Sequence, residues 1–110
     1  MGYVPERGDI VWLSFDPRLG HEQGGHRPAL VLSPAIYNAK AGTMICCPIT
    51  SRRKGYPFQV EISGNPEVSG MVMADQVTSV DWQARAASKK GAVGEEILEE
   101  IGRLLEALLF

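Results

Sequence analysis

Short apolar runs of strand length alternate with breaker segments over most of the chain. Side chains in 9–15 alternate between two faces, and 56–63 shows the same period of two. The stretches 28–33 and 43–50 are continuous apolar runs, and 70–80 has the pattern of a further strand or a bent pair of strands. Five short strands separated by Gly- and Pro-containing segments predict a small antiparallel sheet.

The hydrophobic period changes to that of a helix after Gly94. One helical face is then apolar, and the opposite face is rich in glutamate. The apolar face consists of Ile97, Leu98, Ile101, Leu104, Leu105 and Leu108. We expect this helix to pack on the protein's own sheet, with a partner-binding helix as the alternative. A brief helical turn is expected after Pro34.

These elements together predict a mainly β fold with a C-terminal helix, built on a strongly curved antiparallel sheet or a partly open small barrel. No domain boundary is visible, so we expect residues 1–110 to form a single domain. A chain of 110 residues, 45% of them hydrophobic, can bury a core without disulfides or a structural metal.

The two cysteines, Cys46 and Cys47, are adjacent. Neighbouring side chains on a strand point to opposite faces, so we expect two reduced, partly buried thiols rather than a disulfide. The N-terminus lacks a basic segment followed by an apolar stretch, and no apolar run approaches the roughly 20 residues of a membrane-spanning helix. We therefore expect a cytoplasmic protein that does not enter a membrane.

Charge is distributed unevenly along the chain. The formal net charge is −2, which by itself argues against a nucleic-acid partner. Residues 94–110 carry five glutamates against one arginine, a net of −4, and residues 1–93 carry ten Lys or Arg against eight Asp or Glu, a net of +2. The body of the protein is therefore mildly basic, and a polyanion remains a possible partner.

The segment "GHEQGGHRP" (20–28) first resembles a zinc motif. A zinc-hydrolase helix needs two histidines four residues apart, whereas His21 and His26 are five apart with Gly24 and Gly25 between them. We therefore expect a loop and no metal ligands.

Arg27 stands directly before an apolar strand, where the fold can hold its forked guanidinium ready to bind a phosphate. An inert surface loop is the alternative.

A second polar cluster lies at "PITSRRKG" (48–55). Thr50 and Ser51 end an expected strand, and Arg52, Arg53 and Lys54 follow. Hydroxyl donors beside a basic run are typical of a phosphate-contacting surface, with a solvated hairpin tip as the alternative.

Three other features extend this pattern. Arg85 adds a cation from a second basic segment. Tyr56 and Phe58 could offer stacking faces, although Phe58 fits a core position as well. Asp75 and Gln76 could read base edges by hydrogen bonds or hold a bulge.

Three segments, "GDIVWLSFDPRLGHEQGGHRPALVLSP", "PITSRRKGYPFQV" and "MADQVTSVDWQARAASKKG", together resemble the MazF/PemK family of bacterial toxins in order and spacing. The resemblance covers about Tyr3 to Gly91 and is closest to the MazF branch. It implies an SH3-like small barrel, a homodimer, and the toxin of a type II toxin–antitoxin system. It also implies a cognate MazE-like antitoxin whose acidic C-terminal segment inactivates the toxin.

The activity that the resemblance implies is that of an mRNA interferase. Such an enzyme is a sequence-specific, ribosome-independent endoribonuclease that cuts single-stranded RNA without a metal or other cofactor. The 2′-hydroxyl of the RNA attacks, and the products carry a 2′,3′-cyclic phosphate or 3′-phosphate and a 5′-hydroxyl.

Carried over residue by residue, the family's catalytic arginine falls on Arg27, its catalytic threonine on Thr50 and its loop acid on Glu22. Met73 stands where some plasmid relatives have a further catalytic arginine. The expected RNA-binding residues are Phe15, Asp16, His26, Ser51, Arg52, Arg53, Lys54, Gln76 and Arg85.

Two other functions remain open at this point. A toxin of the same fold could inhibit a protein target such as gyrase without catalysis, because a fold does not determine a function. A non-catalytic RNA-binding module is the second alternative. The pair of Arg27 and Thr50 beside a basic hairpin favours the nuclease, because a protein-binding surface has no need to keep these two residues together.

Overall fold

The computed structural model describes residues 2–14, 25–53, 55–62 and 68–110. Its elements run in the order β1 (Asp9–Ser14), β2 (His26–Val31), α1 (Ala35–Ala41), β3 (Met44–Thr50), β4 (Gln59–Glu61), β5 (Met71–Met73), the 3₁₀ helix η1 (Ala74–Gln76), β6 (Thr78–Val80), β7 (Ser88–Ala92) and α2 (Glu95–Leu109). Every described strand pair is antiparallel, in the order β4-β5-β3-β2-β1-β7, with β6 also paired to β3.

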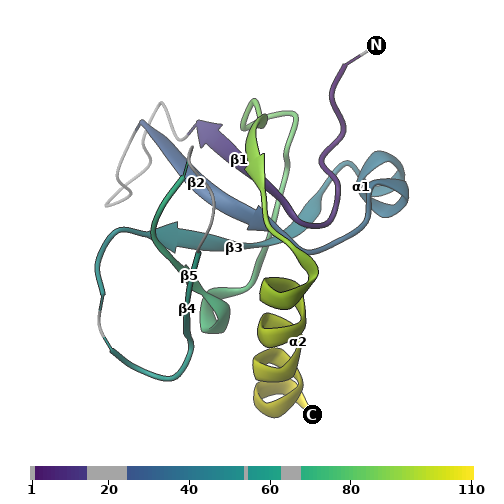
Figure 1. Cartoon of the computed structure of the whole chain (residues 1–110). Coiled ribbons are helices and arrows are strands. Elements are labelled where there is room, and N and C mark those ends of the chain that lie inside the picture. Colours follow the sequence, from purple (N-terminus) through teal and green to yellow (C-terminus); the bar gives the residue numbers. More distant parts are fainter. Residues whose placement is uncertain (1, 15–24, 54, 63–67) are drawn as a thin grey trace, which may run out of the picture.

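The sheet is bent rather than flat. In Figure 1, β4 and β5 run across the direction of β1, β2 and β3, and α2 stands beside the sheet. The path of described strands has two ends, β4 and β7, so within these residues it does not close. The predicted mainly β fold with a strongly curved antiparallel sheet and a C-terminal helix is confirmed. The stretch 70–80 is the bent pair of strands, with η1 at the bend.

The expected number of five strands is wrong, because the described residues alone form seven. Besides the division of 70–80, the sequence pattern missed β7, whose residues Ser88–Ala92 are mostly exposed. This strand has no apolar alternation that could reveal it. It forms because its backbone pairs with β1, from Asp9 opposite Ala92 to Trp12 opposite Ser88.

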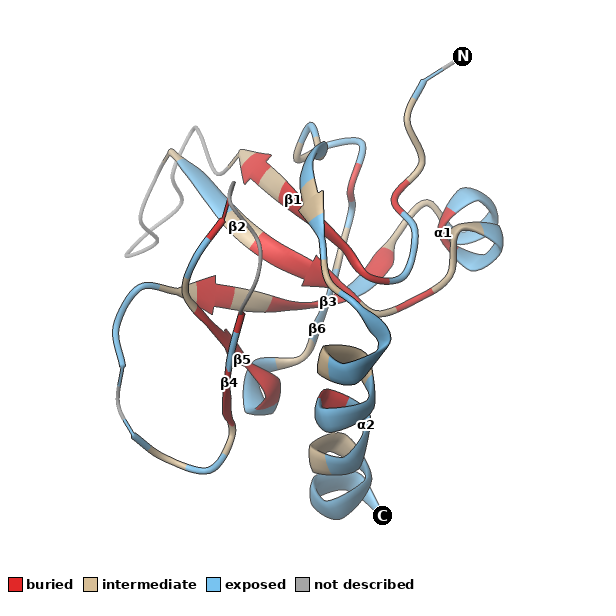
Figure 2. Cartoon of the chain, viewed as in Figure 1, coloured by how far each residue is buried: buried red, intermediate tan, exposed pale blue. Residues whose placement is uncertain are grey.

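Apolar side chains on the two faces of the sheet form two separate core clusters. One contains Ile10 and Leu30 and is covered by α2, whose Ile101 is fully buried. The other contains Val11 and Val31. Figure 2 shows the buried and half-buried positions of α2 turned toward the sheet. The expectation that this helix packs on its own sheet is confirmed, and none of the described helices is long and apolar enough to cross a membrane.

The adjacent thiols lie one in each cluster. Cys46 and Cys47 are both buried and not disulfide-bonded, as expected. Burial raises the pKa of Cys46 to about 11, and burial with the nearby Cys46 and Asp75 raises the pKa of Cys47 to about 12. Both thiols therefore stay protonated at neutral pH. Their contribution to stability is fully present below the pKa of an unfolded cysteine, and it is lost as the pH rises through the folded values.

A buried asparagine organises the connection between β2 and β3. Asn38 in α1 is fully buried, and its Nδ2 donates to the carbonyl oxygens of Pro5 (2.8 Å) and Ser33 (3.0 Å). Its Oδ1 accepts from the Ser33 hydroxyl at 2.6 Å, and Ser33 Oγ in turn accepts from the Ile45 N–H at 2.8 Å. Trp82 Nε1 donates to the Asn38 carbonyl at 2.9 Å. The Asn38 side chain thus joins the N-terminal segment to the residues after β2, and Ser33 links these residues to β3.

Replacing this asparagine should cost much of the stability. We expect Asn38→Ala to lower the free energy of unfolding by about 3 kcal/mol, because it leaves buried polar groups of Ser33 and Pro5 without their partner. Urea unfolding followed by circular dichroism measures the change. The control is Lys40→Ala on the exposed side of the same helix, which should change stability by less than about 0.5 kcal/mol. Equal stability of the two variants would contradict this role for Asn38.

Candidate functional site

The pairing of β2 with β3 brings the two principal site residues together. Ala29 lies opposite Pro48 in the ladder. The ladder ends at this pair, and Arg27 and Thr50 each lie two residues beyond it, on the same face of their strands. Two residues that are 23 positions apart in the sequence therefore line the same pocket.

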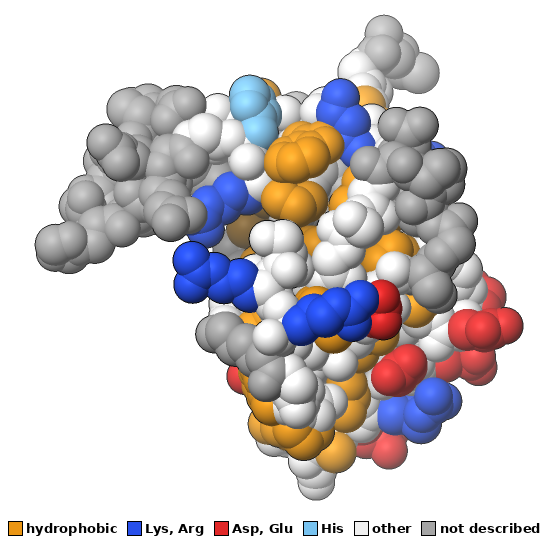
Figure 3. Space-filling view, turned by 60° about the vertical axis from the view of Figure 1, so that its left-hand side comes forward, with side chains coloured by type: hydrophobic (Ala, Val, Ile, Leu, Met, Phe, Trp, Pro, Cys, Tyr) orange, Lys and Arg blue, Asp and Glu red, His pale blue; other side chains and the backbone are white. Residues whose placement is uncertain are grey.

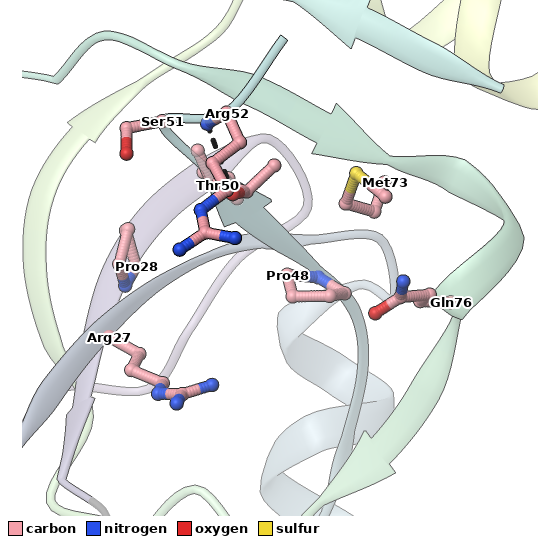
Figure 4. Close-up of a pocket in the computed structure, with 9 residues that line it drawn as sticks. Arg27, Pro28, Pro48, Thr50, Ser51, Arg52, Met73 and Gln76 are labelled. Atoms are coloured by element: carbon pink, nitrogen blue, oxygen red, sulfur yellow. Dashed lines mark hydrogen bonds between the residues drawn. The ribbon is translucent and has the colours of Figure 1, made fainter. Parts of the chain in front are cut away.

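A pocket of about 360 Å³ opens at this point. It lies between the start of β2, the end of β3, β5 and η1. The described residues that line it are Arg27, Pro28, Pro48, Ile49, Thr50, Ser51, Arg52, Met73 and Gln76. In Figure 4 the guanidinium groups of Arg27 and Arg52 extend into the pocket from different sides. The described lining has two cations and no carboxylate, which suits a phosphate.

Local contacts hold the Thr50 side of the pocket. The backbone N–H of Arg52 donates to Thr50 Oγ1 at 3.2 Å, so the hydroxyl can still donate its own hydrogen to a ligand oxygen. Gly70 has φ of +145°, and a Cβ there would lie 2.8 Å from the Thr50 carbonyl oxygen. Only glycine lets the segment before β5 pass this close to the end of β3.

Two hydrogen bonds anchor the segment that follows Thr50. Gln59, which is buried in β4, donates from Nε2 to the Arg52 carbonyl at 2.9 Å. Tyr56 donates its hydroxyl to Asp75 Oδ1 at 2.9 Å, and its ring lies tilted against Phe58 with centroids 6.4 Å apart. Asp75 therefore holds this segment against η1, while its neighbour Gln76 faces the pocket.

The three expected cations of this segment do not have the same environment. Arg53 forms a hydrogen-bonded ion pair with Glu61, with Nη1 3.1 Å from Oε1. This pair raises the pKa of the Arg53 guanidinium and lowers the pKa of the Glu61 carboxyl. Arg52 instead lines the pocket, and Lys54 lies outside the described residues. Arg52 is therefore the better placed of the two described arginines to bind an anion there.

The remaining expected site residues divide into two groups. His26 lines a different depression with Trp12, and Arg85 lies in the turn before β7, where its carbonyl accepts from the Ser14 N–H. Phe15, Asp16 and Glu22 lie outside the described residues. No sequence motif had pointed to Pro28, Pro48 or Ile49 as site residues. Pro48 could have been found, since it shares a strand face with Thr50.

Potential metal ligands do not gather within the described residues. No three His, Cys, Asp or Glu side chains among them come close enough to hold one ion. His21 and Glu22 lie outside this part of the chain.

Comparison with known proteins gives consistent matches over nearly the whole chain. Residues 6–109 match the model of the PemK-like, MazF-like toxin of type II toxin-antitoxin system. The endoribonuclease toxin MazF of Escherichia coli K12 is 51% identical over 107 residues, which are 97% of this chain and 96% of the relative. The endoribonuclease toxin ChpB of the same strain is 39% identical, covering 94% of this chain and 93% of its own.

Solved structures agree with these matches. A crystal structure of MazF from Deinococcus radiodurans superposes with a TM-score of 0.87 at 51% identity, covering 98% of both chains. A MazE–MazF crystal structure from the same organism gives a TM-score of 0.87 at 46% identity, covering 98% of this chain and 97% of the other.

The different environments of the two arginines make a matched test. We expect Arg52→Ala to weaken binding of a single-stranded RNA about tenfold, because a charge-assisted hydrogen bond to phosphate contributes about 1.5 kcal/mol. The log–log slope of affinity against salt should become shallower by about 0.7. Arg53→Ala should change affinity by less than about threefold, since this charge is already paired with Glu61. Fluorescence anisotropy at several salt concentrations measures both variants, and equal losses would contradict the assignment.

Proposed function

The chain belongs to the PemK-like, MazF-like toxin family of type II toxin–antitoxin systems, and on this premise we propose that the Arg27–Thr50 pocket cuts single-stranded RNA by attack of the RNA's own 2′-hydroxyl. The protein is a MazF-type endoribonuclease toxin. The observation that carries the proposed chemistry is the presence of Arg27 and Thr50 in one pocket with a second arginine, Arg52. An inhibitor of a protein target would not need this arrangement.

The proposed reaction needs no metal. The 2′-oxygen forms a bond to phosphorus, the bond from phosphorus to the 5′-oxygen breaks, and the products carry a 2′,3′-cyclic phosphate and a 5′-hydroxyl. DNA lacks the nucleophile and is not cut. Hydrolysis of the cyclic product would leave a 3′-phosphate.

The residues have separate roles in this scheme. Arg27 binds the negatively charged phosphorane through its forked donors, and Thr50 donates a hydrogen bond to the same oxygens. Glu22 is proposed to take the 2′-hydroxyl proton. The leaving 5′-oxygen must also gain a proton. Arg27 is a poor donor, since an arginine has a pKa above about 12, and His26 lines another depression. We therefore propose water as the source of the proton for the leaving 5′-oxygen.

Sequence specificity is proposed to come from the rim of this pocket. Ser51 and Gln76 carry hydrogen-bonding side chains among the described lining residues. Such groups can read the exposed edges of unstacked bases in single-stranded RNA. Phe15, Asp16 and Lys54 are further expected RNA contacts, and they lie outside the described residues.

The direct test is cleavage in excess EDTA. Purified protein is incubated with a long single-stranded RNA or its DNA counterpart, and the ends of any products are mapped. We expect cuts in RNA alone, at a recurring short motif, with 5′-hydroxyl ends. Arg27→Ala should lower the rate at least about 100-fold, the usual cost of removing a donor to a transition-state oxyanion.

The control variant is Arg103→Ala, which removes the same charge from the exposed side of α2 and should cut normally. RNA that stays intact at every protein concentration would refute the nuclease proposal and turn attention to a protein target. Cleavage that disappears with EDTA and returns with added metal would refute the metal-free scheme.

We further propose that a cognate MazE-like antitoxin inhibits the enzyme by competing with RNA. An acidic C-terminal segment and RNA are both extended and negative, so both suit the groove that contains Arg27 and Arg52. The MazE–MazF crystal structures of the Deinococcus relative support such a partner. The proposed location of this encounter is the cytoplasm. A saturating antitoxin that leaves RNA affinity and cleavage unchanged would contradict competition.

A homodimer is the proposed oligomeric state. An apolar depression of about 510 Å³ lies between α1, β3 and α2. Tyr37, Ile45 and Leu109 line it and remain substantially exposed, which is typical of an interaction surface. Light scattering should give twice the 12.0 kDa mass of the chain, and Ile45→Asp should shift it to the monomer. A monomeric native protein would contradict this proposal.

A further inference from the structure

A second depression, of about 340 Å³, lies beside the start of β2 and is lined by Trp12, His26, Ser88 and Lys90. The strand registers explain how these residues meet. Trp12 lies opposite Ser88 in β7, and Ser14 in the same strand lies opposite His26. Since alternate residues share a face, Trp12, Ser88 and His26 are on one face of the sheet, and Arg27 is on the other.

A β-bulge brings a lysine to this depression. Ile10 lies opposite Gly91 and Val11 lies opposite Lys89, so the β7 strand has one extra residue, Lys90. Bulges re-aim side chains next to functional sites. Lys89 lies 3.4 Å from the carboxylate of the buried Asp9, whereas Lys90 lines the depression. The two neighbouring lysines therefore have different environments.

The two tryptophans also differ. Trp82 is buried, and its Nε1 is bonded to the Asn38 carbonyl. Trp12 is only half-buried and contributes to the wall of an open depression. The depression thus combines the aromatic surface of Trp12 with the ammonium group of Lys90, the imidazole of His26 and the Ser88 side chain. This combination fits a nucleotide, since a base can stack on an indole while its phosphate contacts a cation.

The surface links this depression to the catalytic pocket. Figure 3 shows the histidine and several Lys and Arg side chains on one side of the molecule, while the acidic side chains gather mainly in another region. His26 and Arg27 are consecutive residues of β2, one lining each site. The two sites therefore adjoin at the start of β2, which is where a bound RNA would pass from one face of the sheet to the other.

We propose that this depression is a second RNA subsite, which binds a nucleotide flanking the cut site by stacking its base on Trp12 and contacting its phosphate with Lys90. The inference rests on the proposed nuclease function and adds to it a contribution of flanking RNA to affinity. Stacking accepts any base, so the subsite extends the bound RNA without adding to the cut motif. An acidic protein segment would use the cations but would leave the aromatic surface without a specific partner.

The test compares two RNAs that carry the mapped cut motif. One contains the motif alone, and the other adds flanking nucleotides on both sides. A 2′-deoxy nucleotide at the cut position prevents cleavage during binding measurements. We expect Trp12→Leu to weaken binding of the longer RNA about tenfold, the loss expected when an aromatic stacking surface is removed, and to leave the shorter RNA unaffected.

Charge variants provide a matched control. Lys90→Ala should also weaken binding of the longer RNA and reduce the log–log salt slope by about 0.7. Lys89→Ala removes the same charge at the adjacent position and should leave the slope unchanged. Equal effects of the two lysine variants, or equal losses for the two RNA lengths in Trp12→Leu, would overturn the proposal.

Intrinsic fluorescence keeps the test decisive if Trp12→Leu does not fold. The longer RNA should quench tryptophan emission of the native protein, the shorter RNA should not, and the quenching should be absent in Trp12→Phe.

Failure of the native protein to cut either unmodified RNA would refute the proposed function itself. Cleavage of both RNAs with no gain from the flanks would refute only this subsite. Loss of antitoxin binding alone in Lys90→Ala would assign the depression to a protein segment and overturn the proposal.

Discussion

The pairing register of β2 with β3 is the constraint on which the site depends. A shift by one residue would move Arg27 to the opposite face from Thr50 and would dismantle the pocket. The hydrophobic pattern alone fixes this register weakly, because both strands are apolar on both faces: Leu30 and Cys47 belong to one core cluster, and Val31 and Cys46 to the other. The connection through α1 supplies the missing constraint. The buried Asn38 holds Ser33, just after β2, and Ser33 accepts from the Ile45 N–H of β3, so contacts outside the pocket lining support this register.

Side chains that are adjacent in the sequence lie on opposite faces of the sheet and so contribute to different parts of the molecule. His26 and Arg27 project to opposite faces and line different depressions, and Cys46 and Cys47 enter different core clusters. A small sheet can thereby carry the two proposed binding surfaces without additional domains. The surfaces remain close because they share the first residues of β2. Extended single-stranded RNA would suit this arrangement, since it could pass around the beginning of β2 from one face of the sheet to the other.

The sequence made much of the fold predictable where residue type and period agree, as in the apolar face around Ile101 of α2. It also singled out Arg27 and Thr50, because both stand at the ends of apolar runs and both match the family's motifs. It could not distinguish Arg52 from Arg53, because the partner of Arg53 is Glu61 in another strand. β7 escaped prediction for a related reason. Its stability comes from backbone pairing with β1, which leaves no trace in its polar side chains.

The protein has a negative net charge, and so does RNA. The local distribution of charge explains how the two could still bind. The glutamates of α2 account for the negative balance, and Glu95 and Glu96 in its first turn suit the positive end of the helix dipole. Charges separated by more than about 8–10 Å are largely screened in physiological salt. A phosphate in the pocket therefore interacts mainly with Arg27 and Arg52, which line it. The exposed Arg53 is paired with Glu61 and is not among the described residues that line the pocket, so it adds little to the positive charge there.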